Sequence, residues 1–166
     1  IKPVYLDLMG QNRMLISGES ASQSTTALKA MAQLLLSRED NHVWILDGDG
    51  ALARELGDHP NLFYAGGADG LNSAVKELYD QLSQRDEALK DLEDLTDTVD
   101  TEAFARQYPQ ICILINQMHQ VMEQLPEEQA KNLVLLCAAS GSLGAIVLGA
   151  AKAADIGRYM CAENLT

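Results

Sequence analysis

Short apolar runs bounded by turn residues recur along the chain. Most of them are continuous rather than alternating, which is typical of strands that are covered on both faces of a parallel sheet. These runs predict strands at residues 14–16, 43–46, 62–65, 111–115 and 145–148. A run at residues 4–8 alternates apolar and polar side chains, and it predicts a half-buried or edge strand.

Between these runs, apolar residues recur every three or four positions, as on one face of a helix. Residues 27–35 and 118–125 follow this spacing. Pro126 and the two glutamates after it predict the start of another helix, which should run to about Ala139. Strand and helix therefore alternate, and the chain is predicted to be a doubly wound α/β domain with a mostly parallel sheet and helices on both faces.

Residues 69–95 carry a different pattern, a leucine-rich seam with three- and four-residue spacing that Arg85 interrupts. It predicts one long amphipathic helix or a helical hairpin, packed on the sheet by its leucines. The alternative is a surface arm that contacts a neighbouring domain or a partner. An acidic stretch follows at residues 91–102.

Length and charge narrow the function classes. A chain of 166 residues suits a single domain with its own core. The net charge of -12, from 24 acidic and 12 basic residues, argues against nucleic acid as a partner. No apolar run approaches the roughly 20 residues that span a bilayer. Because the chain begins with Ile1 and not with methionine, we expect it to be part of a longer protein, which could carry a membrane anchor elsewhere.

Cysteines and histidines are too scattered to indicate a metal site. No CxxC pair is present, and we expect buried thiols of a reducing compartment. The residues concerned are Cys112, Cys137, Cys161, His42, His59 and His119. His119 is expected to be a surface or packing histidine on the helix after the fourth strand.

A serine-rich loop lies between the first continuous strand and the helix that follows it. Phosphate-binding loops of NTPases have this context and the pattern GxxxxGK[ST], in which glycines expose backbone N–H groups, lysine neutralises phosphate and the hydroxyl holds magnesium. Gly18 and Thr25 match this pattern, whereas Gln23 and Ser24 replace the second glycine and the lysine. The candidate nucleotide-binding residues here are Gly18, Glu19, Ser20, Ala21, Ser22, Gln23, Ser24 and Thr25. Plain helix N-capping by serine is the alternative, and Lys29 could reach back toward the loop.

Two further strand ends complete the comparison with an NTPase. Active enzymes place Asp-Glu after the strand that corresponds to residues 111–115, for magnesium and for the attacking water. Here Asn116 and Gln117 stand in those places, keep the shape and lose the charge. The last strand is followed by residues 149–151, which offer no polar side chain. Each position at which hydrolysis needs a charged or polar group is thus expected to hold an uncharged or apolar one.

In these motifs and their order, the chain resembles the FtsK/SpoIIIE family of ATPases, and within it the C-terminal, third ATPase domain of the membrane-anchored motors of type VII secretion. The resemblance covers most of the chain. It implies a RecA-like P-loop NTPase fold, placement in the cytoplasm, and a role in recognising small helical secreted proteins of WXG type or in regulating the motor. Other ATPase domains of the same polypeptide would hydrolyse ATP, and contact with the membrane would be through the parent protein only.

Three functions remain open at this point. The first is a pseudo-ATPase that requires no cofactor and binds cargo or neighbouring domains. The second is a nucleotide-responsive domain that binds ATP and magnesium weakly, with little or no hydrolysis. The third is an unrelated enzyme that holds magnesium at Asp47 and Asp49, although Asp-Gly-Asp-Gly is also an ordinary turn. Cargo could lie on Met118, Val121, Met122 and Leu125, which are otherwise expected to be core residues.

Overall fold

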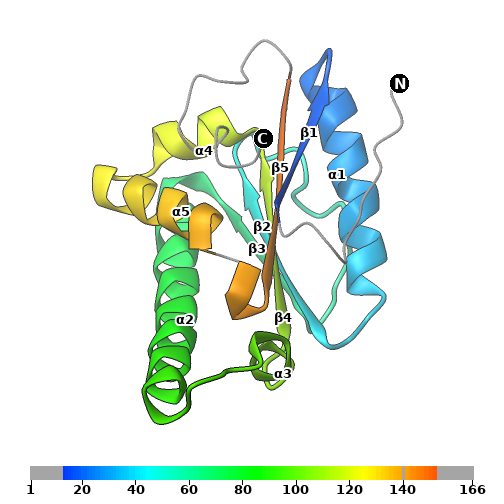
Figure 1. Ribbon diagram of the computed structural model, residues 1–166. Coiled ribbons are helices and arrows are strands. Elements are labelled where there is room, and N and C mark those ends of the chain that lie inside the picture. The colour runs from blue at the N-terminus through cyan, green and yellow to red at the C-terminus, as the bar shows by residue number, and fades with distance from the viewer. Residues whose placement is uncertain (1–12, 140, 153–166) are drawn as a thin grey trace.

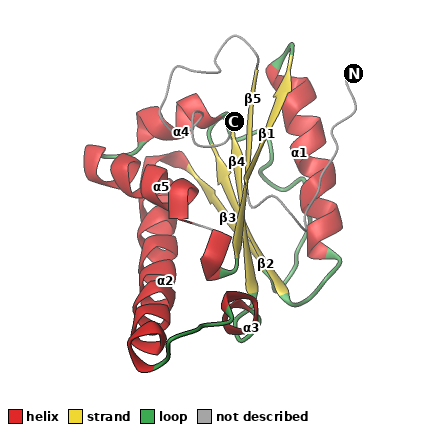
Figure 2. Ribbon diagram, in the orientation of Figure 1, coloured by secondary structure: helices red, strands yellow, loops and turns green. Residues whose placement is uncertain are grey.

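Five parallel strands form one sheet in a computed structural model that describes residues 13–139 and 141–152 (Figure 1, Figure 2). The strands are β1 (Arg13–Gly18), β2 (Asn41–Asp47), β3 (Leu62–Gly66), β4 (Gln110–Asn116) and β5 (Ala145–Lys152). Their order in the sheet is β1-β5-β4-β2-β3, and all the pairs are parallel. The five continuous strands predicted from apolar runs are confirmed. The predicted strand at residues 4–8 and Cys161 lie outside the described residues.

Helices cover both faces of the sheet (Figure 1). Helix α1 (Ala21–Leu36) lies on one face, and α2 (Gly67–Leu95), α4 (Met118–Gln124) and α5 (Glu127–Ala139) lie on the other. The short helix α3 (Thr101–Ala105) and the 3-10 turn η1 (Gly141–Leu143) lie at the amino ends of β4 and β5. The α/β class and the helix-on-both-faces arrangement are confirmed. None of the described helices is both long enough and apolar enough to span a bilayer.

The two faces carry separate cores, as alternate side chains of the strands point to opposite sides. On one face, α1 packs Leu28 and Ala32 against Ile45 and Leu114. The other core joins α2, α4 and α5 to the sheet, and buries Met118, Val121 and Leu125. Those residues are therefore core, as expected. Both Cys112 and Cys137 are buried, and burial raises the pKa of the Cys112 thiol to about 12.

The segment with the leucine seam is a single helix of 29 residues and not a hairpin. Its seam is buried from Leu71 to Leu89. Arg85, which interrupts the seam, is buried as well, and its guanidinium donates to the carbonyls of Pro109 at 2.9 Å and Leu143 at 2.9 Å. It also lies over the Tyr108 ring, 4.7 Å from the centroid. The cation therefore ties α2 to the amino ends of β4 and β5.

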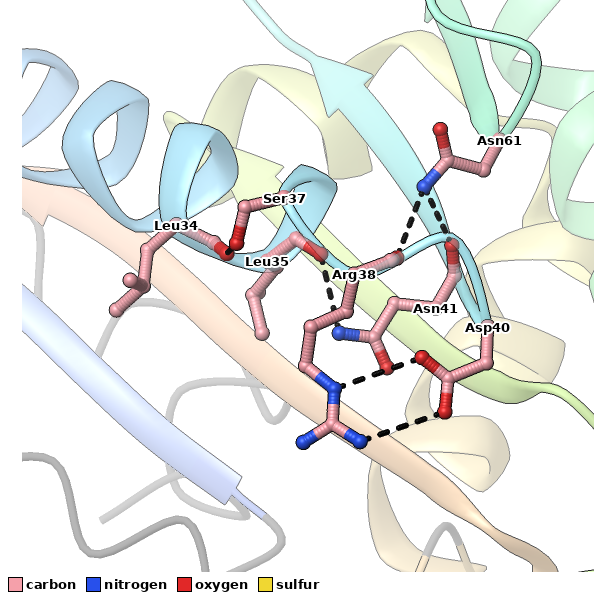
Figure 3. Close-up of polar contacts among 7 residues, drawn as sticks. All are labelled: Leu34, Leu35, Ser37, Arg38, Asp40, Asn41 and Asn61. Atoms are coloured by element: carbon pink, nitrogen blue, oxygen red, sulfur yellow. Dashed lines mark hydrogen bonds and ion pairs between the residues drawn. The ribbon is translucent and has the colours of Figure 1, made fainter.

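Asparagine side chains hold the turn between α1 and β2, at the amino end of the sheet (Figure 3). The Asn41 amide donates to the carbonyl of Leu35 at 3.0 Å. The Asn61 amide donates to the carbonyls of Arg38 at 3.2 Å and Asn41 at 2.9 Å. These bonds satisfy carbonyls at the end of α1 and fix the starts of β2 and β3 relative to each other. The pairing of β2 with β3 then continues in this register to their carboxyl ends, where Asp47 lies opposite Gly66.

The structure corrects three details of the sequence prediction. Strand β3 is not covered on both faces, because it is an edge strand whose Phe63 and Tyr64 are 37% and 41% exposed. Part of the acidic stretch is a helix start, since the Asp100 carboxylate caps α3 by accepting from the N–H of Ala103 at 3.1 Å. Strand β5 continues beyond residue 148 to Lys152.

Candidate functional site

The carboxyl ends of four neighbouring strands converge on the loop before α1. Strand β1 ends at Gly18, β4 ends at Asn116, β2 ends at Asp47, and β5 ends at Lys152. Open α/β sheets bind ligands at such an edge, where the chain leaves the strands in different directions. The predicted loop and the predicted amide pair are thus brought together, although 91 positions separate Thr25 from Asn116.

The backbone donors of the loop are partly used by the side chains of the loop itself. The Ser20 hydroxyl accepts from the N–H of Gln23 at 3.3 Å and caps α1. The Gln23 amide oxygen accepts from the N–H of Glu19 at 3.0 Å. A Cβ added at Gly18 would lie 2.9 Å from the Cβ of Gln23, so the loop is closed tightly on this side chain. Two N–H groups that could face a phosphate therefore have partners within the loop.

The position of the missing lysine is also turned inward. Ser24 is 1% exposed, and its hydroxyl donates to the carbonyl of Ala21 at 3.0 Å. The Gln117 amide donates to the same hydroxyl at 3.0 Å. Lys29 does not replace the lost charge at the loop, because its ammonium pairs with Glu55 at 3.0 Å. Neither residues 18–25 nor Lys29 therefore supplies an unpaired positive charge to the phosphate position.

Asn116 is the centre of the site. Its amide nitrogen donates to Asp47 at 2.8 Å and to Asp49 at 3.0 Å, so that each carboxylate receives one of the two amide protons. Its amide oxygen accepts from the Thr25 hydroxyl at 2.9 Å. Asn116 is fully buried. A neutral amide therefore joins the Thr25 hydroxyl to the carboxylates of Asp47 and Asp49.

Asp47 extends this network to the edge strand β3. The carboxylate is 1% exposed, and it accepts from the N–H of Leu52 at 2.9 Å and from the Tyr64 hydroxyl at 2.6 Å. Burial, the hydrogen bond to Asp47 and the charges of Asp47 and Asp49 raise the pKa of Tyr64 well above its ordinary value. A chain of hydrogen bonds therefore runs from Tyr64 through Asp47 and Asn116 to Thr25.

Gln117 lies where an active NTPase places its glutamate. Its backbone is left-handed, with φ 54°, and its side chain is fully buried. The amide nitrogen donates to Ser24 and to the carbonyl of Ala21 at 3.3 Å. The amide oxygen has no hydrogen-bond partner among the described residues. The hydrogen bonds that its amide nitrogen donates hold the Gln117 side chain in place. Gln117 has no carboxylate with which to polarise water.

The sequence alone did not indicate two residues at this end of the sheet, Tyr64 and Lys152. It predicted Asp47 only as a magnesium ligand with Asp49 or as part of a turn, and not as a hydrogen-bond partner of Asn116. Residues 149–151 carry no polar side chain, and the residue after them, Lys152, pairs in register with Gly18. Every second residue of β5, from Ile146 to Ala150, packs on the α1 face of the sheet. Lys152 continues this alternation, so it belongs to the same face. The acidic end of the apolar run at 43–47 was the available signal for Asp47.

Magnesium with ATP is the group that this fold implies, and the residues fit it poorly. Thr25 and the Asn116 amide already bond to each other, and two backbone donors of the loop, at Glu19 and Gln23, are occupied. Glu19, Asp47 and Asp49 place negative charge around the phosphate position. Within the described ranges, no group of three or more His, Cys, Asp or Glu side chains could hold a metal ion. The geometry is that of a closed, hydrogen-bonded site.

Solved structures of secretion and conjugation ATPases share this fold. The cytoplasmic domain of EssC matches with a TM-score of 0.76 at 17% identity, over 99% of this chain and 32% of that one. Thermomonospora curvata EccC (ATPases 2 and 3), solved in complex with a signal sequence peptide, matches with the same TM-score, identity and coverage. EssC (ATPases 2 and 3) from Geobacillus thermodenitrificans matches with a TM-score of 0.69 at 19% identity, over 97% of this chain and 32% of that one.

The likeness to the ATPase domains of EssC, which the motifs indicated, is confirmed at the level of the fold, as is the RecA-like P-loop class. This chain spans about a third of the length of those three structures. No protein-family model matches the sequence. No curated protein matches it either.

Proposed function

We propose that this chain is a non-catalytic, pseudo-ATPase domain of a type VII secretion motor, which acts in cargo recognition or in regulation of the motor. The observation that carries the proposal is the Asn116 bridge, in which one neutral amide bonds Thr25, Asp47 and Asp49. Catalysis of phosphoryl transfer rests on positioned metal and positive charge. The loop lacks the lysine that supplies the positive charge, and β4 ends with Asn116, followed by Gln117, in place of the Asp-Glu pair that positions the metal and the water.

Partners follow from the same proposal. The fold is shared with proteins that carry several ATPase domains, one of which was solved with a signal sequence peptide. We therefore expect this chain to contact other ATPase domains of one polypeptide and small helical secreted proteins of WXG type. The parent protein would be the ATPase and would hold the domain in the cytoplasm, at the membrane.

Phosphate release with ATP and magnesium tests the non-catalytic assignment. We expect turnover no higher than that of the Thr25→Ala variant, which lacks the hydroxyl that would hold magnesium. Turnover comparable with that of an active motor, and lost in Thr25→Ala, would overturn the proposal. An intact ATPase domain assayed in parallel provides the positive control.

A nucleotide-responsive domain is the second candidate, and Lys152 is the observation that favours it. Its Cα pairs with that of Gly18, so its ammonium could supply the charge that the loop lacks. In this function ATP binds without efficient cleavage and shifts contacts with a neighbour. Saturable ATP binding that is lost in Lys152→Ala, without phosphate release, would establish this candidate over the first.

A further inference from the structure

Strand β3 is an edge that the described part of the chain leaves open. It pairs with β2 only, in parallel. The segment Leu62–Gly66 contains no charged residue and no proline, although natural sheets commonly protect their edge strands with such residues. Phe63 and Tyr64 point to opposite faces of the sheet and are both exposed. An edge of this kind is a template for a further strand.

The backbone of β3 shows which groups are available. The carbonyl of Asn61 accepts from the N–H of Val43 on β2 at 2.9 Å. Because the backbone groups of successive residues alternate between the two sides of a strand, Phe63 and Ala65 share this direction. The N–H and C=O of Tyr64 therefore point to the open side, and so does the C=O of Leu62. Only an extended backbone presents donors and acceptors at the matching spacing.

A groove of about 560 Å³ runs beside this edge on the α1 face. Leu62 and Tyr64 contribute from the strand, and Leu52 and Leu56 contribute from the segment that precedes it. Arg54 and His59 also line it, and Asp58 is the only carboxylate among its described lining residues. The ion pairs of the described residues do not include Arg54, which is exposed. The groove thus combines an apolar floor with a guanidinium that takes part in none of those ion pairs.

The other face of the edge is aromatic. Phe63 stacks on Trp44 with ring centroids 4.6 Å apart and an interplanar angle of 17°, and His42 lies 5.7 Å from Phe63. The indole N–H of Trp44 is buried and has no hydrogen-bond partner among the described residues. A strand added to β3 would place alternate side chains in the groove and beside this stack.

From these features we infer that the β3 edge and its groove bind an extended peptide segment that carries an acidic side chain for Arg54. This inference deepens the recognition role proposed above and rests on it. The free backbone groups require an extended segment, and the guanidinium selects a carboxylate. A second copy of this chain, with the same net charge of -12, is opposed by repulsion.

Binding at this edge reaches the candidate site directly. Tyr64 lines the groove, and its hydroxyl bonds Asp47, which bonds Asn116. A peptide on β3 therefore contacts the outer end of the hydrogen-bond chain that ends at Thr25. The edge is a recognition surface joined to the centre of the former nucleotide site.

A peptide titration tests this inference. The probe is the acetylated and amidated hexapeptide Val-Thr-Val-Glu-Val-Thr, and a fluorescein-labelled form gives the affinity by anisotropy. Trp44, the only tryptophan of the chain, reports on the edge through its emission. We expect saturable binding with a change in Trp44 emission, and a loss of at least about tenfold when alternate amides of the peptide are N-methylated. Replacing glutamate with glutamine in the peptide should weaken binding about threefold or more.

Variants locate the site. Phe63→Glu should weaken binding at least about tenfold, and Leu34→Glu, at an exposed leucine on α1, should leave it unchanged. Arg54→Ala should remove the preference for glutamate over glutamine while the fold, followed by circular dichroism, is intact. Absence of saturable binding at millimolar peptide, equal binding of the N-methylated peptide, or an unchanged glutamate preference in Arg54→Ala would overturn the inference. Sedimentation that detects a dimer lost in Phe63→Glu would assign the edge to a second copy instead. None of these outcomes changes the phosphate-release result.

Discussion

At the scale of single residues, Asn116 decides what the site is. A carboxylate at this position would face two other carboxylates, those of Asp47 and Asp49, at hydrogen-bond distance. The amide removes that repulsion and supplies a proton to each of them. Asn116 therefore stabilises the arrangement of Thr25, Asp47 and Asp49 around it.

Asn116→Asp should consequently destabilise the domain. Three carboxylates would share a buried site, and the cost is about 2–4 kcal/mol near neutral pH. Like charges raise the pKa of the new carboxyl in the folded state, so the loss is largest above that raised pKa and shrinks as the pH falls through it toward the unfolded value of about 4. Thermal unfolding between pH 3.5 and 7.5 measures this, with Asn132→Asp on α5 as the control. Equal stability of Asn116→Asp and the parent chain would contradict the role given to Asn116.

Tyr64→Phe removes the hydrogen bond to Asp47 and nothing else of the ring. The bond joins a hydroxyl to a buried carboxylate, and we expect a loss of about 1–2 kcal/mol in the free energy of unfolding. The pKa of Tyr64 is raised by folding, so its contribution is complete below about pH 10 and is lost as the pH rises above that value. Denaturant unfolding at pH 7 and pH 10.5 would show the difference between the two chains narrowing at high pH. A constant difference would refute the coupling.

At the scale of elements, the strands were predictable and their neighbours were not. Apolar runs predicted β1 to β5, and the leucine seam predicted α2, because the spacing of apolar residues depends only on the local sequence. No local pattern states that β2 lies beside β4, which is what brings Asp47 to Asn116. For the same reason β3 read as a buried strand, although it is the edge. Sequence therefore predicted the loop and the amide pair, but not the contact of Asp47 with Asn116, and it did not indicate Tyr64 or Lys152.

Arg85 belongs to this scale, because it joins α2 to the segments before β4 and β5. Burial lowers the pKa of its guanidinium, which still donates to three backbone carbonyls. Arg85→Met leaves those carbonyls unsatisfied and should cost about 2–4 kcal/mol, and Arg85→Lys should recover only part of it, since lysine lacks the planar fork. The matched control is Arg106→Met, whose exposed pair with Glu102 should contribute less than about 1 kcal/mol. Urea unfolding gives all three values, and similar losses for Arg85→Met and Arg106→Met would contradict this assignment.

At the scale of the whole molecule, the fold is shared with the solved ATPase structures of EssC and EccC. The sheet order, the helix coverage and those structures agree on the architecture. Polar groups of the loop and of the Asn116 bridge are hydrogen-bonded to one another. In the function proposed above, the domain contributes surfaces rather than hydrolysis, and the β3 edge is the surface inferred for it.

Titration calorimetry with ATP and magnesium tests the closed site most directly. The account predicts no saturable heat at up to a few millimolar nucleotide for this chain, and none for Lys152→Ala. A loop restored by Gln23→Gly and Ser24→Lys together with Asn116→Asp serves as the comparison, in which the missing cation and the metal ligand are returned. Saturable binding by the unaltered chain with a dissociation constant below about 1 mM, lost in Thr25→Ala, would contradict the account.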